Sequence, residues 1–217
     1  MQTQSEIYQP NKALQFFAKL ISYVFHPLFI PTYIFLFLVY QFPYEFTVAM
    51  QFQLNLKLAS TFIMTAFFPA FAVFLLWRLQ FINSIFLKTQ KERIIPFFIT
   101  MFFYWWMYYL GRNMKDQPEV LKFFYFGIFI STAIGVIINN FIKISLHGIA
   151  MGSAAMAVVL FSVFYQTQLT NAISVAVLAT GLVCTARFLV SDHTNEEVYT
   201  GVAVGIICQV FAYWFVL

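Results

Sequence analysis

The chain has 217 residues, of which 62% are hydrophobic, 21% aromatic and only 9% charged, and its mean hydropathy is +0.81. Soluble domains carry about 25% charged and about 45–50% apolar residues. The composition therefore excludes an ordinary water-soluble domain, a disordered chain, a coiled coil and a disulfide-stapled secreted module. It predicts an integral membrane protein, and the length suits one domain over residues 1–217 rather than two.

The first ten residues, Met1 to Pro10, are polar and lack the basic segment that begins a cleavable signal peptide. The apolar run that follows is too long for such a peptide, so we expect it to remain as the first membrane anchor. It contains His26, Pro27 and Pro31, which predict a kink or a helix that begins later. His26 is interpreted as a structural histidine near that kink.

Seven apolar stretches reach or approach the length of about 20 residues that a helix needs to cross the hydrocarbon core. They are apolar on every face rather than alternating, which favours helices over the strands of a barrel. Pro96 near the start of the third stretch suits the first turn of a helix. The predicted fold class is all-α, a polytopic transmembrane bundle of six to seven helices. In chain order the stretches are Leu20–Phe42, Leu58–Trp77, Ile94–Leu110, Phe123–Ile142, His147–Gln166, Leu169–Ala186 and Val198–Leu217.

Two pairs of glycines have the spacing that lets membrane helices approach closely. Gly148 and Gly152 are four residues apart, and so are Gly201 and Gly205. We interpret both pairs as helix-packing positions without a further role.

Two further pairs lie in or beside apolar stretches. Asn139 and Asn140 near the end of the fourth stretch are interpreted as interhelical hydrogen-bonding residues. Cys184 and Cys208 are interpreted as packing residues rather than as a disulfide or a metal site.

The net charge is +4, from 12 Lys and Arg against 8 Asp and Glu. The basic residues lie in short gaps rather than on one exposed face, so we expect no nucleic-acid partner. Crossing parity places the N-terminus and the gaps after the second, fourth and sixth stretches on one side. The positive-inside rule would make that side cytoplasmic, but five of its eight basic residues belong to the polar cluster described next, so the orientation stays open. The eight are Lys12, Lys19, Arg78, Lys88, Lys91, Arg93, Lys143 and Arg187.

Three segments on this side hold most of the polar residues that could carry chemistry: Lys88–Pro96, Lys143–Gly148 and Arg187–Glu197. Parity brings them to one level of the bilayer although they are distant in sequence. Cations, two histidines and a carboxylate at this depth are costly and indicate function. Together they suit an anionic ligand whose tail lies in lipid.

Each segment also has a structural interpretation. The basic residues of the first could form a solvated loop that touches anionic headgroups. In the second, Ser145 could be the N-cap of a helix and His147 a first-turn residue facing water. In the third, Thr194 and Glu197 fit a capping box that opens the last helix. We expect Glu197 to serve either the cap or a polar site well, but not both at once.

In combination, the spacing Arg-x5-His-x3-Glu, preceded by Ser-x-His and by a basic stretch ending Arg-x-x-Pro, resembles the signature of the type 2 phosphatidic acid phosphatase family. That superfamily includes the lipid phosphate phosphatases and the vanadium haloperoxidases. Its blocks are Lys-x6-Arg-Pro, Pro-Ser-Gly-His and Ser-Arg-x5-His-x3-Asp. The resemblance covers about 110 residues, from Lys88 to Glu197, and the third block is the most specific.

The first two blocks depart from the signature. Lys88 precedes Arg93 by five residues rather than seven, and Pro96 follows two residues late. Ile144 and Leu146 replace the proline and glycine of the second block. A hydrophobic hairpin also separates these two blocks, whereas six-span family members usually keep them in one loop.

The third block departs at two positions. Ala186 replaces the serine, which removes one possible hydrogen bond to phosphate. Glu197 replaces the aspartate, which keeps the charge and could still reach the histidine.

The resemblance implies a metal-independent phosphatase without a cofactor, acting through a phosphohistidine. His193 would be the nucleophile, Glu197 would hold its other ring nitrogen, and His147 would protonate the leaving alkoxide and later help to activate water. The implied phosphate-binding residues are one of Lys88 and Lys91 together with Arg93, Ser145 and Arg187.

General chemistry agrees with these roles, because guanidinium groups match phosphoryl oxygens and helix N-termini attract phosphate. The scattered histidines and apolar cysteines form a poor metal-ligand set. We expect a membrane phosphatase acting on a lipid phosphate or diphosphate, in a bacterial inner membrane. A transporter or headgroup-binding protein using the same pocket is the alternative, and a catalytically dead relative is a third possibility that the retained histidines argue against. The particular lipid and the oligomeric state stay open.

Overall fold

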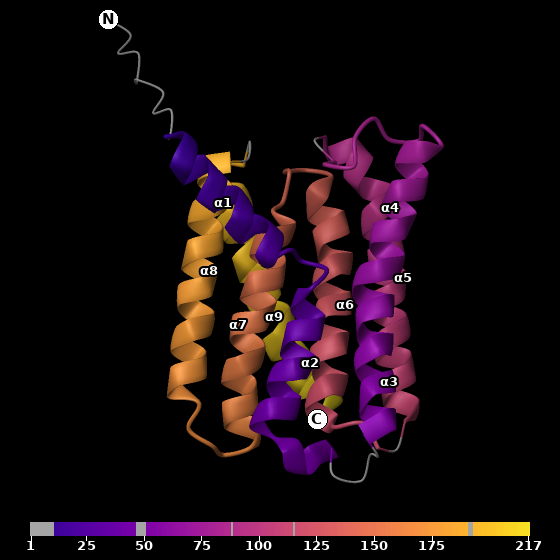
Figure 1. The fold of residues 1–217 in the computed structure, drawn as a ribbon, viewed down its shortest axis with the longest axis vertical. Helices are drawn as coiled ribbons and strands as arrows, with labels where there is room; N and C mark the ends of the chain where they lie inside the picture. The colour runs from indigo at the N-terminus through magenta and orange to yellow at the C-terminus, as the bar shows by residue number, and fades with distance from the viewer. Residues whose placement is uncertain (1–10, 47–50, 88, 115, 191–192) are drawn as a thin grey trace, which may run out of the picture.

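The helices run up and down the long axis of the molecule, in a computed structural model that describes residues 11–46, 51–87, 89–114, 116–190 and 193–217 (Figure 1). Within these ranges six helices are long and apolar enough to cross a membrane. The fold is an all-α bundle, as predicted, with the architecture of a multi-pass membrane protein. The six are α3 to α4 (Gln51–Arg78), α5 (Gln90–Asn113), α6 (Glu119–Asn139), α7 (Leu146–Phe164), α8 (Thr170–Val190) and α9 (Asn195–Val216).

The first of these is made of three consecutive segments. α3 (Gln51–Phe62) passes through a π-helical turn, η2 (Ile63–Phe67), into α4 (Phe68–Arg78). Pro69 is the second residue of α4, where its missing N–H and its ring disturb the regular helix at the wide turn. The predicted second stretch falls within this helix, and the later five stretches overlap α5 to α9.

The first predicted stretch, Leu20–Phe42, is not one helix. α1 (Lys12–Val24) and α2 (Ile30–Gln41) are separated by a five-residue break, and a 3-10 turn, η1 (Pro43–Phe46), follows α2. Pro27 explains the break, because it lacks an N–H and disfavours helical geometry in the residue before it. The predicted kink is therefore a full interruption. α1 also begins earlier than expected, at a cap formed by Asn11.

The connections between the helices lie at the ends of the bundle that crossing parity predicted. The end of α4 and the starts of α5, α7 and α9 lie at the end of the bundle where α1 begins, and the C-terminus lies at the other end (Figure 1). The described parts of the three polar segments therefore lie at one end of the bundle.

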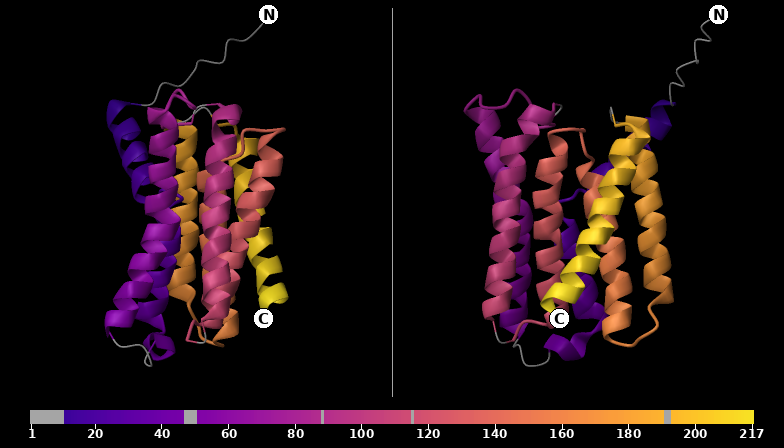
Figure 2. Two further views of the ribbon diagram at one scale, coloured as in Figure 1. Left: turned by 90° about the vertical axis from the view of Figure 1, so that its right-hand side faces the viewer. Right: turned by 180° about the vertical axis from the view of Figure 1, so that it is seen from behind.

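α7 and α9 pack backbone against backbone, in line with the glycine spacing. A Cβ atom added to Gly201 would lie 2.6 Å from the carbonyl oxygen of Ser145. A Cβ atom added to Gly148, Gly152 or Gly205 would come at least as close to a backbone oxygen of the facing helix. α9 runs obliquely across α7 and α6 when the molecule is seen from behind (Figure 2). This contact fixes the starts of α7 and α9 beside each other.

The two asparagines differ in role. Asn139 donates from Nδ2 to the carbonyl oxygen of Gln90 at 3.0 Å, which joins α6 to α5 as predicted. Asn140 donates to Val136 in its own helix, so its predicted interhelical role is wrong. Cys184 and Cys208 are free and buried, consistent with packing.

Candidate functional site

His193 lies just before α9 and is held by the carboxylate one turn later. Its Nδ1 is 2.7 Å from Oε2 of Glu197, and the His193 side chain is only 2% exposed. The same Oε2 accepts a hydrogen bond from the N–H of Thr194, at 3.2 Å. Thr194 in turn caps the helix by accepting from the N–H of Glu197 at 3.3 Å.

The expectation that Glu197 could serve only one of its two roles well is therefore wrong. A capping box folds the glutamate back onto the N–H of the N-cap residue, here Thr194, and His193 is the residue directly before that cap. One carboxylate oxygen consequently reaches both the Thr194 amide and the imidazole. The cap itself positions the carboxylate for His193.

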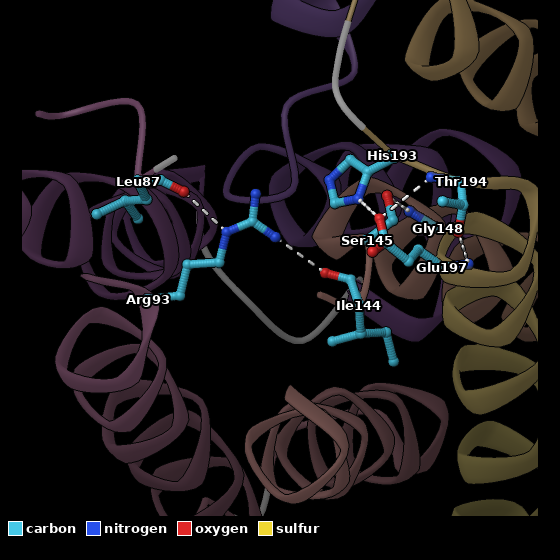
Figure 3. A network of polar contacts seen from close by, with 8 residues as sticks. All are labelled: Leu87, Arg93, Ile144, Ser145, Gly148, His193, Thr194 and Glu197. Carbon is cyan, nitrogen blue, oxygen red and sulfur yellow. Dashed lines mark hydrogen bonds and ion pairs between the residues drawn. The ribbon is translucent and has the colours of Figure 1, made fainter. Parts of the chain in front are cut away.

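The protonation state of His193 follows from its surroundings. Burial lowers its pKa from 6.5 to about 4, and the positive charges of Arg93 and Arg187 act in the same direction, whereas the hydrogen bond to Glu197 opposes them. The ring is therefore neutral at pH 7. A carboxylate only accepts, so Nδ1 carries the proton and Nε2 keeps its lone pair. In Figure 3, Nε2 lies on the side of the ring that faces Arg93.

Arg93 connects the first polar segment to the second. It is 7% exposed in the first turn of α5, which begins at a capping box formed by Thr89. Its Nε donates to the carbonyl oxygen of Leu87 at 2.8 Å, and its Nη1 donates to that of Ile144 at 3.1 Å. Figure 3 shows the third guanidinium nitrogen pointing away from both carbonyls. This buried cation is thus anchored on one side, with donors left on the other.

Ser145 connects the second segment to the third. It is fully buried as the N-cap of α7, where its hydroxyl oxygen accepts from the N–H of Gly148 at 3.3 Å. Its own N–H donates to the carbonyl oxygen of Glu197 at 3.1 Å. The capping interpretation of Ser145 is therefore confirmed, and its role as a phosphate ligand stays a prediction.

His147 does not simply face water, as its structural interpretation assumed. Its Nε2 lies 3.0 Å from the carbonyl oxygen of Ser22 in the last turn of α1. Its ring also packs against that of His26, with the centroids 5.6 Å apart. The break between α1 and α2 therefore forms one wall of the site, and His26 and Ser22 are two neighbours that the sequence motifs did not identify. The only sequence signal was a His-Pro pair inside an apolar stretch.

Arg187, in the last turn of α8, is central to the cluster. It lies near enough to His26, His147 and His193 to interact electrostatically with each of them, and also with Arg93. The two guanidinium groups and the two predicted catalytic histidines are therefore gathered at one place.

The remaining predicted basic residues lie differently. Lys91 is exposed in the first turn of α5. Lys88 lies outside the described residues. Among the residues that the structure describes, no three His, Cys, Asp or Glu side chains are grouped to hold a metal ion.

Comparison of the chain with protein-family models, curated proteins and solved structures finds no match.

Proposed function

We propose that the protein is an integral membrane phosphatase that hydrolyses a lipid phosphate or diphosphate through a phosphohistidine intermediate. The observation that carries this proposal is the His193–Glu197 pair, 2.7 Å apart, beside the charges of Arg93 and Arg187. A neutral imidazole with a fixed tautomer is a competent nucleophile, and guanidinium groups neutralise phosphoryl oxygens.

In the first half of the reaction, Nε2 of His193 attacks phosphorus. The P–N bond forms while the P–O bond to the lipid alkoxide breaks, and His147, as the imidazolium ion, gives the alkoxide its proton. Glu197 stabilises the positive charge that develops on the His193 ring. In the second half, water attacks phosphorus, the P–N bond breaks, and His147 takes the proton from water.

The lipid character of the proposed substrate is supported by the position of the cluster. It lies at one end of helices whose outer faces are apolar, so a bound headgroup would leave its chains among those helices. An apolar groove of about 380 Å³ between α2 and α3 could accept part of a chain. Phe62 on its wall stacks on Phe29, which contacts His26 beside the site. We propose that this membrane is a bacterial inner membrane.

The direct test measures phosphate release by purified protein from phosphatidate, phosphatidylglycerol phosphate and a polyprenyl diphosphate, with a chelator present. We expect release from at least one lipid, and His193→Ala should remove nearly all of it. Arg78→Ala is the matched control, because Arg78 is an exposed cation at the same end of the bundle but outside the cluster. Headgroup binding without cleavage would instead identify a transporter or binding protein, and an unchanged His193→Ala rate would refute the assignment.

A further inference from the structure

The break between α1 and α2 leaves one helix carbonyl without its usual partner. In a continuous helix the carbonyl oxygen of Ser22 would accept from the N–H of His26, four residues later. The N–H of His26 instead donates to the carbonyl oxygen of Tyr23 at 3.3 Å. The Ser22 oxygen accepts from Nε2 of His147, at 3.0 Å. A side chain of α7 thus completes the end of α1.

The other carbonyls at the end of α1 are also satisfied. That of Ile21 accepts from the N–H of Phe25 at 2.9 Å, and that of Val24 accepts from the hydroxyl of Tyr33 at 3.0 Å. Every one of the four orphan groups expected at a helix C-terminus therefore has a partner. The bond to His147 is part of this termination rather than an incidental contact.

This bond determines the tautomer of His147. A backbone carbonyl only accepts, so Nε2 must carry a proton, and in the neutral ring Nδ1 has the lone pair. Nδ1 is therefore the nitrogen through which His147 can exchange a proton with a leaving group or with water. Nε2 keeps its proton throughout.

His26 packs against the His147 ring, which is oriented by its hydrogen bond to Ser22. The His26 ring stands at 82° to that of His147, with centroids 5.6 Å apart. Its own orientation is fixed because Nδ1 accepts from the N–H of Leu28 at 3.4 Å and because Phe29 packs beside it at 6.0 Å. Two constraints thus act on His147: a hydrogen bond sets its tautomer, and a flat ring limits its rotation.

We propose that His26 is a positioning residue for His147, keeping the imidazole in the orientation in which Ser22 holds Nε2–H and Nδ1 is free to exchange the proton. Its role in turnover rests on the proposed phosphatase function, whereas its effect on the His147 tautomer does not. If His26 were a packing residue without this role, its substitution would change neither the tautomer of His147 nor the catalytic rate constant.

The test combines histidine ring NMR with kinetics on the full-length protein in detergent. The chain has three histidines, so each labelled ring can be assigned from single variants. In wild type we expect neutral His147 to be the Nε2–H tautomer alone. In His26→Ala we expect mixed tautomers and a kcat lower by about 10–100-fold, with KM changed by less than about twofold, because misplacement of a catalytic group mainly affects the chemical step.

Three variants separate positioning from general loosening. His26→Phe keeps a flat ring in place and should recover the single tautomer and most of kcat. His26→Leu fills the space without a flat ring, should behave as His26→Ala, and replaces it if that variant does not fold. Tyr33→Phe removes another hydrogen bond at the end of α1, the one to Val24, and leaves the contacts of His147 in place. The tautomer of His147 and kcat should both stay at wild-type values.

The outcomes are distinguishable. A single Nε2–H tautomer with wild-type kcat in His26→Ala or His26→Leu overturns the inference, and so does a His26→Phe protein as defective as these variants. If wild type releases no phosphate, or if His193→Ala is fully active, the proposed function fails. The tautomer of His147 in the His26 variants then still decides whether His26 positions it.

Discussion

Gly148 of α7 and Val198 of α9 are so close that a Cβ atom on Gly148 would lie 2.6 Å from the Val198 carbonyl oxygen. This approach places the cap of α7 next to the first turn of α9, where Ser145 N–H bonds to the Glu197 carbonyl. Backbone cannot move aside as a flexible side chain can. The glycine contact therefore supports both the stability of the bundle and the geometry of the site.

Gly148→Ala is accordingly expected to force the two helices apart. Overpacking of this kind typically costs about 1–3 kcal/mol, and the thermal unfolding midpoint in detergent should fall together with phosphate release. Gly181→Ala is the control, since a Cβ on Gly181 in α8 would meet nothing within 4 Å. Equal midpoints for the two variants would contradict the proposed importance of the α7–α9 contact.

The two roles of Glu197 can be separated by two substitutions. Glu197→Gln keeps an oxygen for the Thr194 amide but removes the charge beside His193, so turnover should fall by roughly 10⁴-fold, as for the carboxylate–imidazole pair of serine proteases. Thr194→Ala removes the cap hydroxyl but keeps the charge, so stability should fall by about 1 kcal/mol while most of the turnover remains. Unfolding midpoints and phosphate release measured on both proteins check this crossover. A similar loss of turnover in the two variants would argue against an electrostatic role for Glu197.

Much of this arrangement could be predicted from sequence because it depends on local patterns. Apolar runs identified the six long helices, the glycine spacing identified positions of close helix packing but not the α7–α9 pairing itself, and crossing parity brought the polar segments to one end. The contact of His147 with α1 could not be predicted, since it joins residues 125 positions apart and depends on where Pro27 ends α1. The double role of Glu197 was missed because it depends on the position of one oxygen atom. A spacing motif specifies which residues are neighbours, but it does not specify how many bonds each atom makes.

The lowered pKa of His193 also predicts how the free energy of unfolding depends on pH. Its pKa is lowered from 6.5 in the unfolded chain to about 4 in the folded protein, mainly by burial. Between these values the unfolded chain binds more protons, so the free energy of unfolding rises with pH across this window and falls as the pH drops through it. Wild type should lose more of its unfolding midpoint between pH 7 and pH 4.5 than His193→Gln does. The other histidines are present in both proteins, so parallel losses would show that His193 is not buried as a neutral base.

Removal of the predicted acid tests the other half of the site. His147→Ala should lower turnover by about 10²–10⁴-fold, the usual contribution of a general acid or base. The loss should be smaller for a substrate whose leaving group is a good one, such as an aryl phosphate, because that group departs without a proton. The ratio of lipid to aryl phosphate hydrolysis is therefore the measurement. An equal loss for both substrates would indicate that His147 does not act as the acid for the leaving group.

Arg93 is expected to resist replacement by lysine. Its guanidinium group donates to Leu87 and Ile144 from two nitrogens while it keeps donors on a third, and a lysine ammonium cannot reproduce this fork. Loss of a hydrogen bond from a charged group costs roughly 1.5–3 kcal/mol, so Arg93→Lys should lower both the unfolding midpoint and phosphate release although the charge is retained. Lys91→Ala, which removes an exposed cation two residues earlier, should change the midpoint little. If Arg93→Lys matches wild type in both measurements, a positive charge alone is sufficient at this position and the fork has no role.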